Sequence, residues 1–212
     1  MLILASASPR RHRLLTEWGV PHRVAPSRIP EPAPRRTAPI AYARRLALAK
    51  ALAVAKGVRP LSSKRGLTPL EGKGAGSWVL GADTIVVVGR RIFGKPRGVV
   101  DAERMLRALS GTTHRVITAV ALVHLARTKG ARPPWHRVRH AVSRVTMRRL
   151  TPEELHRFAR KHRDKAGGYA IQDSGDTVIE TIEGSYTNVV GLPKEIVLPL
   201  LRRAGVTPVS SR

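Results

Sequence analysis

The sequence predicts an α/β fold in which strands and helices alternate along 212 residues. Short apolar runs bounded by turn residues recur along the chain, and most are followed by a segment with helical spacing. One such run, residues 115–125, is apolar on both alternations, as in a central strand that is covered on two faces. Residues 151–154 read TPEE, the pattern of a capping box that opens a helix.

The first forty residues predict a strand, a helix and a loop. Residues 2–5 read LILA and indicate a short buried strand. Ser8 is a plausible N-cap for the following helix, with Pro9 at the first helical position. Gly19 follows that helix where a C-terminal glycine is expected. Residues 25–39 are rich in proline and predict an extended loop.

The middle of the chain predicts a second helix and a long β segment. Apolar residues at helical spacing place the helix at about 39–56. Residues 59–77 are rich in Gly, Ser and Pro, and we expect a flexible surface insertion within an otherwise single domain spanning 1–212. Residues 78–82 predict an apolar strand that ends at Asp83, and 84–88 continue as β structure.

The remaining elements follow the same alternation. Gly89 begins a turn before a short strand at 92–93, and a helix carries the apolar residues of 102–109 on one face. Residues 135–149 predict a long, more exposed strand.

Beyond the capping-box helix, short β segments are expected at 168–172 and 177–182. A closing helix begins near Pro193, and Pro199 is expected to kink it.

Composition excludes several classes of site. Cysteine is absent, which excludes disulfides, thiol nucleophiles and thiolate metal sites. No stretch approaches the length needed to span a bilayer. A signal peptide places basic residues before a longer apolar run, whereas here a short apolar run comes first, so we expect a cytoplasmic protein with no membrane partner. Lysine and arginine number 39 against 14 acids, a net charge of +25. This excess fits either a polyanion partner or a general arginine bias on a solvated surface.

The first candidate site is the amino end of the helix near residue 9. Ser6, Ser8, Arg10 and Arg11 place hydroxyl and guanidinium donors beside the unpaired N–H groups of a helix terminus. Such a cluster favours anion binding, although an N-cap with surface arginines is the simpler alternative.

The second candidate is Asp83, a carboxylate that directly follows an apolar strand. α/β sheets bind ligands at the carboxyl ends of their strands, so Asp83 is a candidate to bind a metal or activate water, or else it caps a turn. Lys50 and Lys95 are point charges suited to phosphate oxygens or simply to solvent. Gln172 follows a pair of glycines and offers an amide that can read a base edge.

Two other catalytic classes are not supported. The eight histidines show no HExxH pattern, so we expect no zinc site. The GxSxG motif of serine hydrolases is absent.

Several motifs together resemble the Maf family of nucleoside triphosphate pyrophosphatases. They are LILASASPRR (2–11), RLALAKA (45–51), GADTIVV with FGKP (81–96), LSGTTHRV (109–116), DKAGGYAIQ (164–172) and IEGSYTNVVGLP (182–193). The resemblance covers nearly the whole chain outside 59–77. It implies a mixed central sheet with flanking helices and two lobes around a cleft, similar to inosine triphosphatase-like folds.

The resemblance also implies the chemistry of the site. The family hydrolyses a nucleoside triphosphate between its α and β phosphates with a divalent cation, Mg²⁺ or Mn²⁺, and its catalytic acid falls on Asp83. Its phosphate-binding residues fall on Ser6, Arg11, Lys50, Lys95 and Lys165. Its metal residues fall on Glu31 and Asp83, although only the glutamate of the family's usual Asp-Glu pair is kept here.

Three positions resemble the branch that acts on dTTP and UTP: Arg10, Thr84 and Gln172. A homodimer is also what the resemblance suggests. Two alternatives are kept: the sister branch that acts on 7-methyl-GTP, and a basic cell-division regulator that binds nucleic acid through charge. If the chain is the enzyme, we expect nucleic acid to bind it at most non-specifically.

Overall fold

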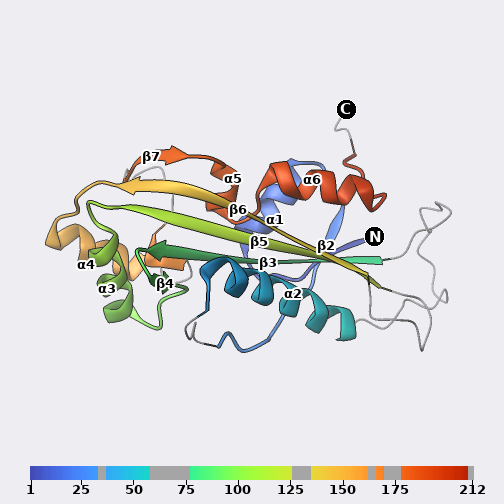
Figure 1. Ribbon diagram of the computed structural model, residues 1–212, viewed down its shortest axis with the longest axis horizontal. Helices are drawn as coiled ribbons and strands as arrows, with labels where there is room; N and C mark the ends of the chain where they lie inside the picture. The colour runs from blue at the N-terminus through green and yellow to red at the C-terminus, as the bar shows by residue number, and fades with distance from the viewer. Residues whose placement is uncertain (33–36, 58–76, 126–134, 162–165, 170–177, 210–212) are drawn as a thin grey trace.

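A mixed seven-stranded sheet runs through the computed structural model, which describes residues 1–32, 37–57, 77–125, 135–161, 166–169 and 178–209 (Figure 1). The predicted α/β class, with a mixed sheet and flanking helices, is confirmed. The strand order is β2-β1-β3-β5-β6-β7, and β4 pairs with β3 outside this path. The strands are β1 (Leu2–Leu4), β2 (His22–Val24), β3 (Ser77–Val88), β4 (Arg91–Phe93), β5 (Thr113–Leu125), β6 (His136–Met147) and β7 (Ile179–Glu183).

The helices lie on both faces of this sheet. They are α1 (Pro9–Glu17), α2 (Pro39–Gly57), α3 (Val99–Leu109), α4 (Pro152–Lys161), α5 (Tyr186–Val190) and α6 (Lys194–Arg203), with a 3₁₀ turn η1 (Ala166–Gly168). β1 is parallel to its neighbours β2 and β3, and every other strand pair is antiparallel.

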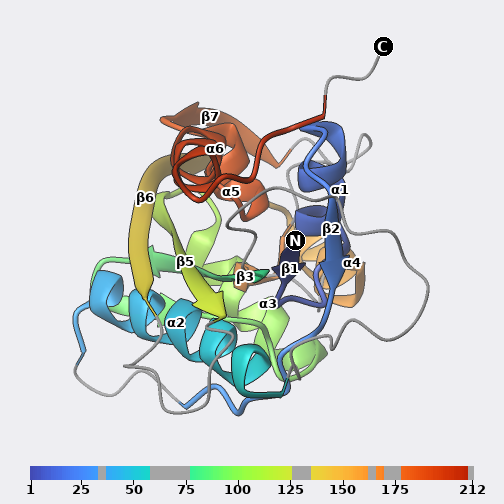
Figure 2. The ribbon, with the colours of Figure 1, turned by 90° about the vertical axis from the view of Figure 1, so that its right-hand side faces the viewer.

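Helix α2 lies along one face of the sheet, against β3 and β5 (Figures 1 and 2). Its apolar residues pack with the odd-numbered residues of β3 and β5, among them Val79 and Ile117. Gly81 makes the approach possible, because a Cβ there would meet the carbonyl oxygen of Ala47 and lie 2.7 Å from the backbone nitrogen of Ala51. The close packing fixes α2, and every side chain on it, against the middle of β3.

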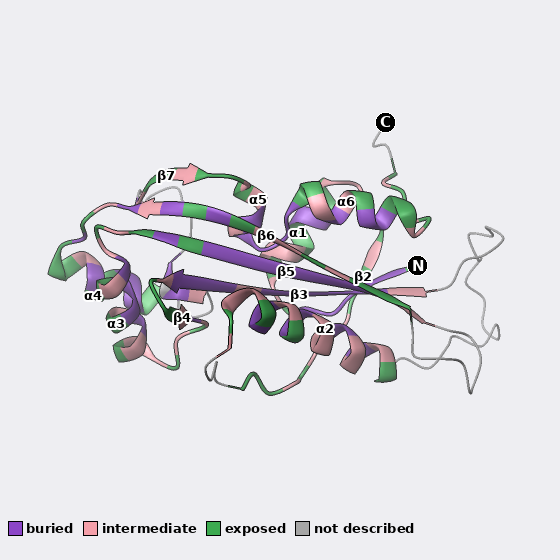
Figure 3. Ribbon diagram, viewed as in Figure 1, coloured by how far each residue is buried: buried purple, intermediate pink, exposed green. Residues whose placement is uncertain are grey.

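The opposite face carries two separate apolar clusters. One joins Leu80 and Val120 to helices α1, α5 and α6, and the other joins Val86 and Val116 to helices α3 and α4. β3 and β5 are therefore buried along most of their length, as Figure 3 shows.

The edge of β3 that faces away from β5 is only partly paired. β1 pairs with residues 78–80 and β4 with residues 86–88, while β5 occupies the other edge. Residues 81–85 therefore have no strand beside them on this edge among the described residues. Because side chains of a strand alternate between faces, Asp83 points to the α2 side and Thr84 to the α1 side of this gap.

The structure corrects several expectations. The β structure expected at 84–88 is confirmed, but there is no strand end at Asp83: β3 runs through it, and Asp83 pairs with Ala119 in the middle of the β3–β5 ladder. Aspartate is rare in strands, so in the sequence it suggests a strand end. The pairing of Asp83 with β5 involves residues far away in the chain and cannot be seen locally. The Ser8 side chain makes no cap hydrogen bond, although the residue has the extended backbone of an N-cap.

Other differences concern the short elements. β2 and α5 were not expected, because the residues of β2, HRV, do not form an apolar run and α5 has too few residues to show a helical period. Gly168 belongs to the 3₁₀ turn η1 and not to a strand, and 170–172 lie outside the described residues. The expected insertion lies outside them too, except Ser77, which begins β3.

The capping box at the start of α4 is confirmed. The Thr151 hydroxyl accepts from the backbone N–H of Glu154, and the Glu154 carboxylate accepts from the backbone N–H of Thr151. Among the helices of the described ranges, none combines the length and the apolar character needed to cross a bilayer.

We predict that Gly81→Ala lowers the free energy of unfolding by about 1–3 kcal/mol, because the added methyl group forces α2 off the sheet. Urea denaturation followed by circular dichroism measures the change. Gly57→Ala is the matched control, since a Cβ at that position meets nothing within 4 Å. Equal transition midpoints for the Gly81 and Gly57 variants would contradict a close α2–β3 contact.

Candidate functional site

A cavity of about 380 Å³ opens at the unpaired edge of β3. It brings together residues that are far apart in the sequence, because β1, α2 and β4 all converge on this part of β3. Nine of the candidates named from sequence line it: Ser6, Ser8, Arg10, Arg11, Glu31, Lys50, Asp83, Thr84 and Lys95. Lys165 and Gln172 lie outside the described residues, and their roles stay predictions.

Lys50 joins two carboxylates at the centre of this cavity. Its Nζ lies 2.6 Å from Oδ1 of Asp83 and 2.6 Å from Oε1 of Glu31. The Asp83 side chain is 5% exposed and that of Glu31 is 39% exposed. The cluster therefore runs from the buried sheet to the cavity mouth, with one cation between two acids.

The loop that carries Glu31 is tied to α2 by a second contact. The hydroxyl of Tyr42 donates a 2.7 Å hydrogen bond to the carbonyl oxygen of Pro32. Tyr42 lies on α2 two turns before Lys50, so the same helix positions the ammonium group and the backbone next to Glu31.

The environment moves the two carboxyl groups in opposite directions. Burial raises the pKa of Asp83, and the charge and hydrogen bond of Lys50 offset this only in part. Burial acts on Glu31 in the same sense, but Lys50 and the charges of Lys95 and Arg11 outweigh it, so the pKa of Glu31 falls below its ordinary value. Two acids with pKa values pushed apart are suited to different roles.

The second carboxylate oxygen of Asp83 is the free position of the cluster. Oδ1 accepts from Lys50, whereas Oδ2 is buried and has no hydrogen-bond partner among the described residues. A buried acceptor without a partner is costly, so this atom is suited to bind water, a cation or a substrate group.

Arg11 is held mainly by the protein itself. Its Nε donates to the carbonyl of Gly191, Nη1 donates to the Ser6 hydroxyl and the Ala82 carbonyl, and Nη2 donates to the Thr84 hydroxyl, at 2.9–3.1 Å. The Ala82 carbonyl lies on the edge of β3 where, among the described residues, no neighbouring strand donates a hydrogen bond to it. Partners among the described residues thus occupy four of the five guanidinium N–H groups, and the fifth has none among them.

Gly191 makes this arrangement possible. Its φ of +123° lies in the region that favours glycine, and a Cβ there would lie 3.2 Å from Nε of Arg11. The chain can therefore turn after α5 with its carbonyl facing the guanidinium. Burial lowers the pKa of Arg11, and the nearby Asp83 carboxylate opposes that shift.

Tyr169 forms another wall of the cavity, and a buried histidine holds its hydroxyl. Tyr169 lines the cavity, is 5% exposed, and its hydroxyl lies 2.7 Å from Nε2 of His114. His114 is 2% exposed, and burial lowers its pKa to about 4, with the backbone of Thr112 opposing the shift in part. Sequence reasoning missed this pair, because the motif letters do not show that β5 and the segment after α4 meet.

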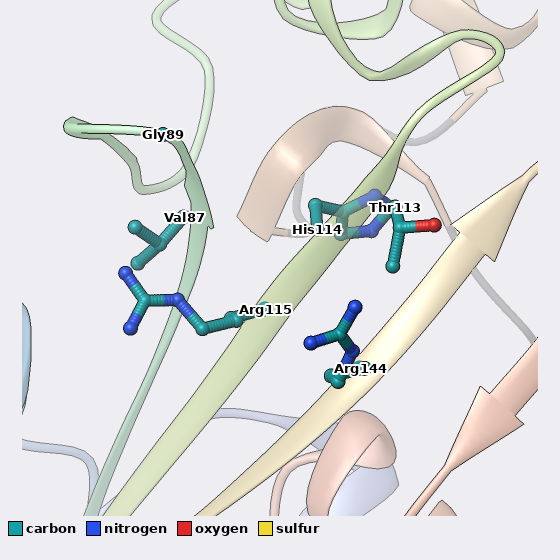
Figure 4. A pocket seen from close by; sticks show the side chains of 6 residues that line it. All are labelled: Val87, Gly89, Thr113, His114, Arg115 and Arg144. Atoms are coloured by element: carbon teal, nitrogen blue, oxygen red, sulfur yellow. The ribbon is translucent and has the colours of Figure 1, made fainter.

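A second hollow of about 220 Å³ lies on the sheet beyond the main cavity (Figure 4). Arg115 and Arg144 line it from facing positions on β5 and β6, and Arg144 lies 3.3 Å from the carboxylate of Glu183. None of the residues predicted for chemistry lines it. The main cavity is therefore the candidate site.

Comparison with known proteins finds matches over nearly the whole chain. Residues 1–204 match the family model described as Maf-like protein. The chain is 44% identical to a dTTP/UTP pyrophosphatase of Moorella thermoacetica, over 97% of this chain and 95% of that protein. It is 43% identical to one of Thermomicrobium roseum, over 99% and 86% of the two chains, and 41% identical to one of Geobacter sulfurreducens, over 96% of each.

The buried histidine predicts a pH dependence of stability. Its pKa falls from 6.5 when unfolded to about 4 when folded, so between these values the unfolded chain binds the extra proton. Stability is therefore full above pH 6.5 and is lost as the pH falls toward 4, by about 3 kcal/mol in total.

We expect His114→Gln to flatten the decline of the melting temperature over this range, measured by calorimetry. Tyr169→Phe is the control: it removes the hydrogen bond but leaves the imidazole buried, so the variant is less stable yet keeps the wild-type slope. If the melting temperature of His114→Gln falls with pH as steeply as that of the wild type, another group is responsible.

Proposed function

The chain belongs to the Maf-like protein family, and we propose that it is a nucleoside triphosphate pyrophosphatase that hydrolyses dTTP and UTP to the monophosphate and pyrophosphate. The cluster of Glu31, Lys50 and Asp83 carries the proposal. It places a buried carboxylate with a raised pKa beside cations in a cavity large enough for a nucleotide. The names of the relatives supply the pyrimidine substrates.

Asp83 acts as the general base in this proposal. Lys50 occupies Oδ1, so Oδ2 is the atom that accepts a proton from water. The water oxygen then attacks the α phosphorus. The bond from phosphorus to the bridging oxygen breaks, and its electron pair leaves with pyrophosphate. A raised pKa makes the carboxylate a stronger base than an exposed aspartate.

The cations of the cavity neutralise the triphosphate. Lys95 is exposed at the edge of the cavity, where its ammonium group can reach phosphate oxygens. The Ser6 oxygen accepts from Arg11 and from the Ser8 N–H, so its own O–H group can still donate a hydrogen bond to a ligand. We propose that Ser6, Lys50, Lys95 and Lys165 contact phosphate directly, and that Arg11 contributes its charge and at most one hydrogen bond.

A divalent cation fits the carboxylates of the site. In the described part of the chain no three acidic or histidine side chains converge, so a cage made of protein alone is not found there. Mg²⁺ commonly uses one or two carboxylates and completes its shell with phosphate oxygens and water. The exposed carboxylate of Glu31 matches that pattern. Oδ2 of Asp83 would supply the second carboxylate oxygen in the alternative in which Asp83 binds the metal and positions the water instead of taking its proton. When bound, Mg²⁺ or Mn²⁺ supplies positive charge to the phosphate oxygens.

Three residues are proposed to select the nucleotide: Arg10, Thr84 and Gln172. Arg10 and Thr84 line the cavity from the α1 side, opposite the face that carries Asp83. The base and the scissile phosphates would then meet different faces of one strand edge. A homodimer in the cytoplasm completes the proposal, and sedimentation velocity measures its oligomeric state.

A substrate panel tests the activity. We expect pyrophosphate release with Mg²⁺ or Mn²⁺ to be fastest from dTTP and UTP, with the monophosphate as co-product identified by chromatography. Preference for 7-methyl-GTP would instead assign the sister-branch activity. Release of single phosphate groups from every nucleotide would contradict cleavage between the α and β phosphates.

We predict that Asp83→Asn lowers kcat by roughly 100-fold or more, because the amide cannot accept the proton of the attacking water. Steady-state pyrophosphate release measures the loss, and circular dichroism checks that the fold is retained. Asp101→Asn is the matched control, since Asp101 pairs with Arg104 on the outer surface of α3. Near-normal turnover of Asp83→Asn would remove this residue from the mechanism.

A further inference from the structure

Thr84 lies at the start of a buried chain of hydrogen bonds. Its hydroxyl oxygen is 2.9 Å from Nη2 of Arg11 and 2.9 Å from the hydroxyl oxygen of Thr118. The Thr118 hydroxyl lies 2.8 Å from the backbone carbonyl of Asn188. Thr118 and Asn188 are both 0% exposed, so water does not compete for these bonds.

The direction of every bond in this chain is fixed by its ends. The carbonyl of Asn188 can only accept, so the single proton of Thr118 points toward it. Thr118 must then accept from Thr84, and the proton of Thr84 is committed to Thr118. Arg11 can only donate, and it takes one lone pair of the Thr84 oxygen. One lone pair remains, so toward the cavity the Thr84 hydroxyl is an acceptor and not a donor.

Asn188 holds the far end of the chain rigidly. Its side-chain oxygen accepts from the backbone N–H of Thr118, and its amide nitrogen donates to the carbonyl of Val116 and to the Ser143 hydroxyl, at 2.9–3.1 Å. Its backbone N–H donates to the Ser185 hydroxyl, which caps α5. Because each polar group of the side chain has a partner, neither the amide nor the Thr118 hydroxyl can turn over without loss of a bond.

We propose that Thr118 and Asn188 are positioning residues that make Thr84 a fixed hydrogen-bond acceptor and so favour uracil and thymine over cytosine. Uracil and thymine present one N–H donor on the pairing edge, at N3, where cytosine presents an acceptor. A fixed acceptor binds the donor and repels the lone pair, whereas a rotating hydroxyl would accommodate both. The inference rests on the proposed pyrophosphatase activity and on Thr84 facing the base.

The test compares kcat/KM for UTP and CTP, which share the same ribose and triphosphate. Thr118→Val keeps the shape of the side chain but removes the acceptor, which frees the Thr84 proton to turn toward the cavity. We expect the UTP/CTP ratio to fall roughly tenfold, the scale of one hydrogen bond made or left unmade. Thr118→Ser restores the hydroxyl and should restore the ratio.

Two further variants separate this role from a structural one. Thr118→Ala also lacks the hydroxyl and substitutes for the valine variant if that one does not fold. Thr113→Val removes a hydroxyl from the same strand, where it bonds to Thr146 away from the main cavity, and should leave the ratio unchanged.

The outcomes distinguish the inference from the proposal beneath it. If the wild type prefers UTP and the variants without the hydroxyl keep that ratio while melting at a lower temperature, the chain of bonds is only structural and the inference is wrong. If the wild type releases pyrophosphate from neither nucleotide, the proposed function fails and the inference falls with it.

Discussion

The contact of one ammonium group with two carboxylates organises the whole site. Lys50 lies between a buried acid on the sheet and a half-exposed acid on a loop, at 2.6 Å from each. Without the lysine, the buried aspartate would face another carboxylate in an apolar environment, and one of them would have to take up a proton. With it, burial keeps the pKa of Asp83 raised while Glu31 stays an anion.

That contact depends on how closely a helix approaches the sheet. Gly81 lets the backbone of α2 rest on β3, and one turn along α2 from Ala47 the Lys50 side chain reaches Asp83. The same part of β3 lacks a neighbouring strand on its outer edge, since β1 stops before it and β4 starts after it. An unpaired edge in the middle of a buried sheet gives a ligand access to both faces, and Arg11 takes up the Ala82 carbonyl left open there.

The two faces of this edge have different electrostatic character. The α2 side holds the ionised cluster around Asp83, while the α1 side holds a chain of neutral hydroxyl and amide groups that ends in the guanidinium of Arg11. Charged groups suit the phosphates, which carry most of the substrate's charge, and fixed neutral dipoles suit the edge of a base. Consecutive residues of one strand can therefore serve different parts of a nucleotide.

The sequence by itself determined the α/β class, most of the long helices and strands, the capping box of α4, and the family, because periodicity, capping and local motifs are properties of neighbouring residues. It also named the charged residues of the cavity, but it placed Asp83 at the end of a strand. Only the tertiary structure showed that Asp83 lies inside one uninterrupted strand and pairs with Ala119. It also showed that Arg11 donates mainly to protein acceptors, and that Tyr169, Thr118 and Asn188 support the cavity. These features arise from contacts between distant segments, and neither the register of a sheet nor the partner of a buried hydroxyl is written in local sequence.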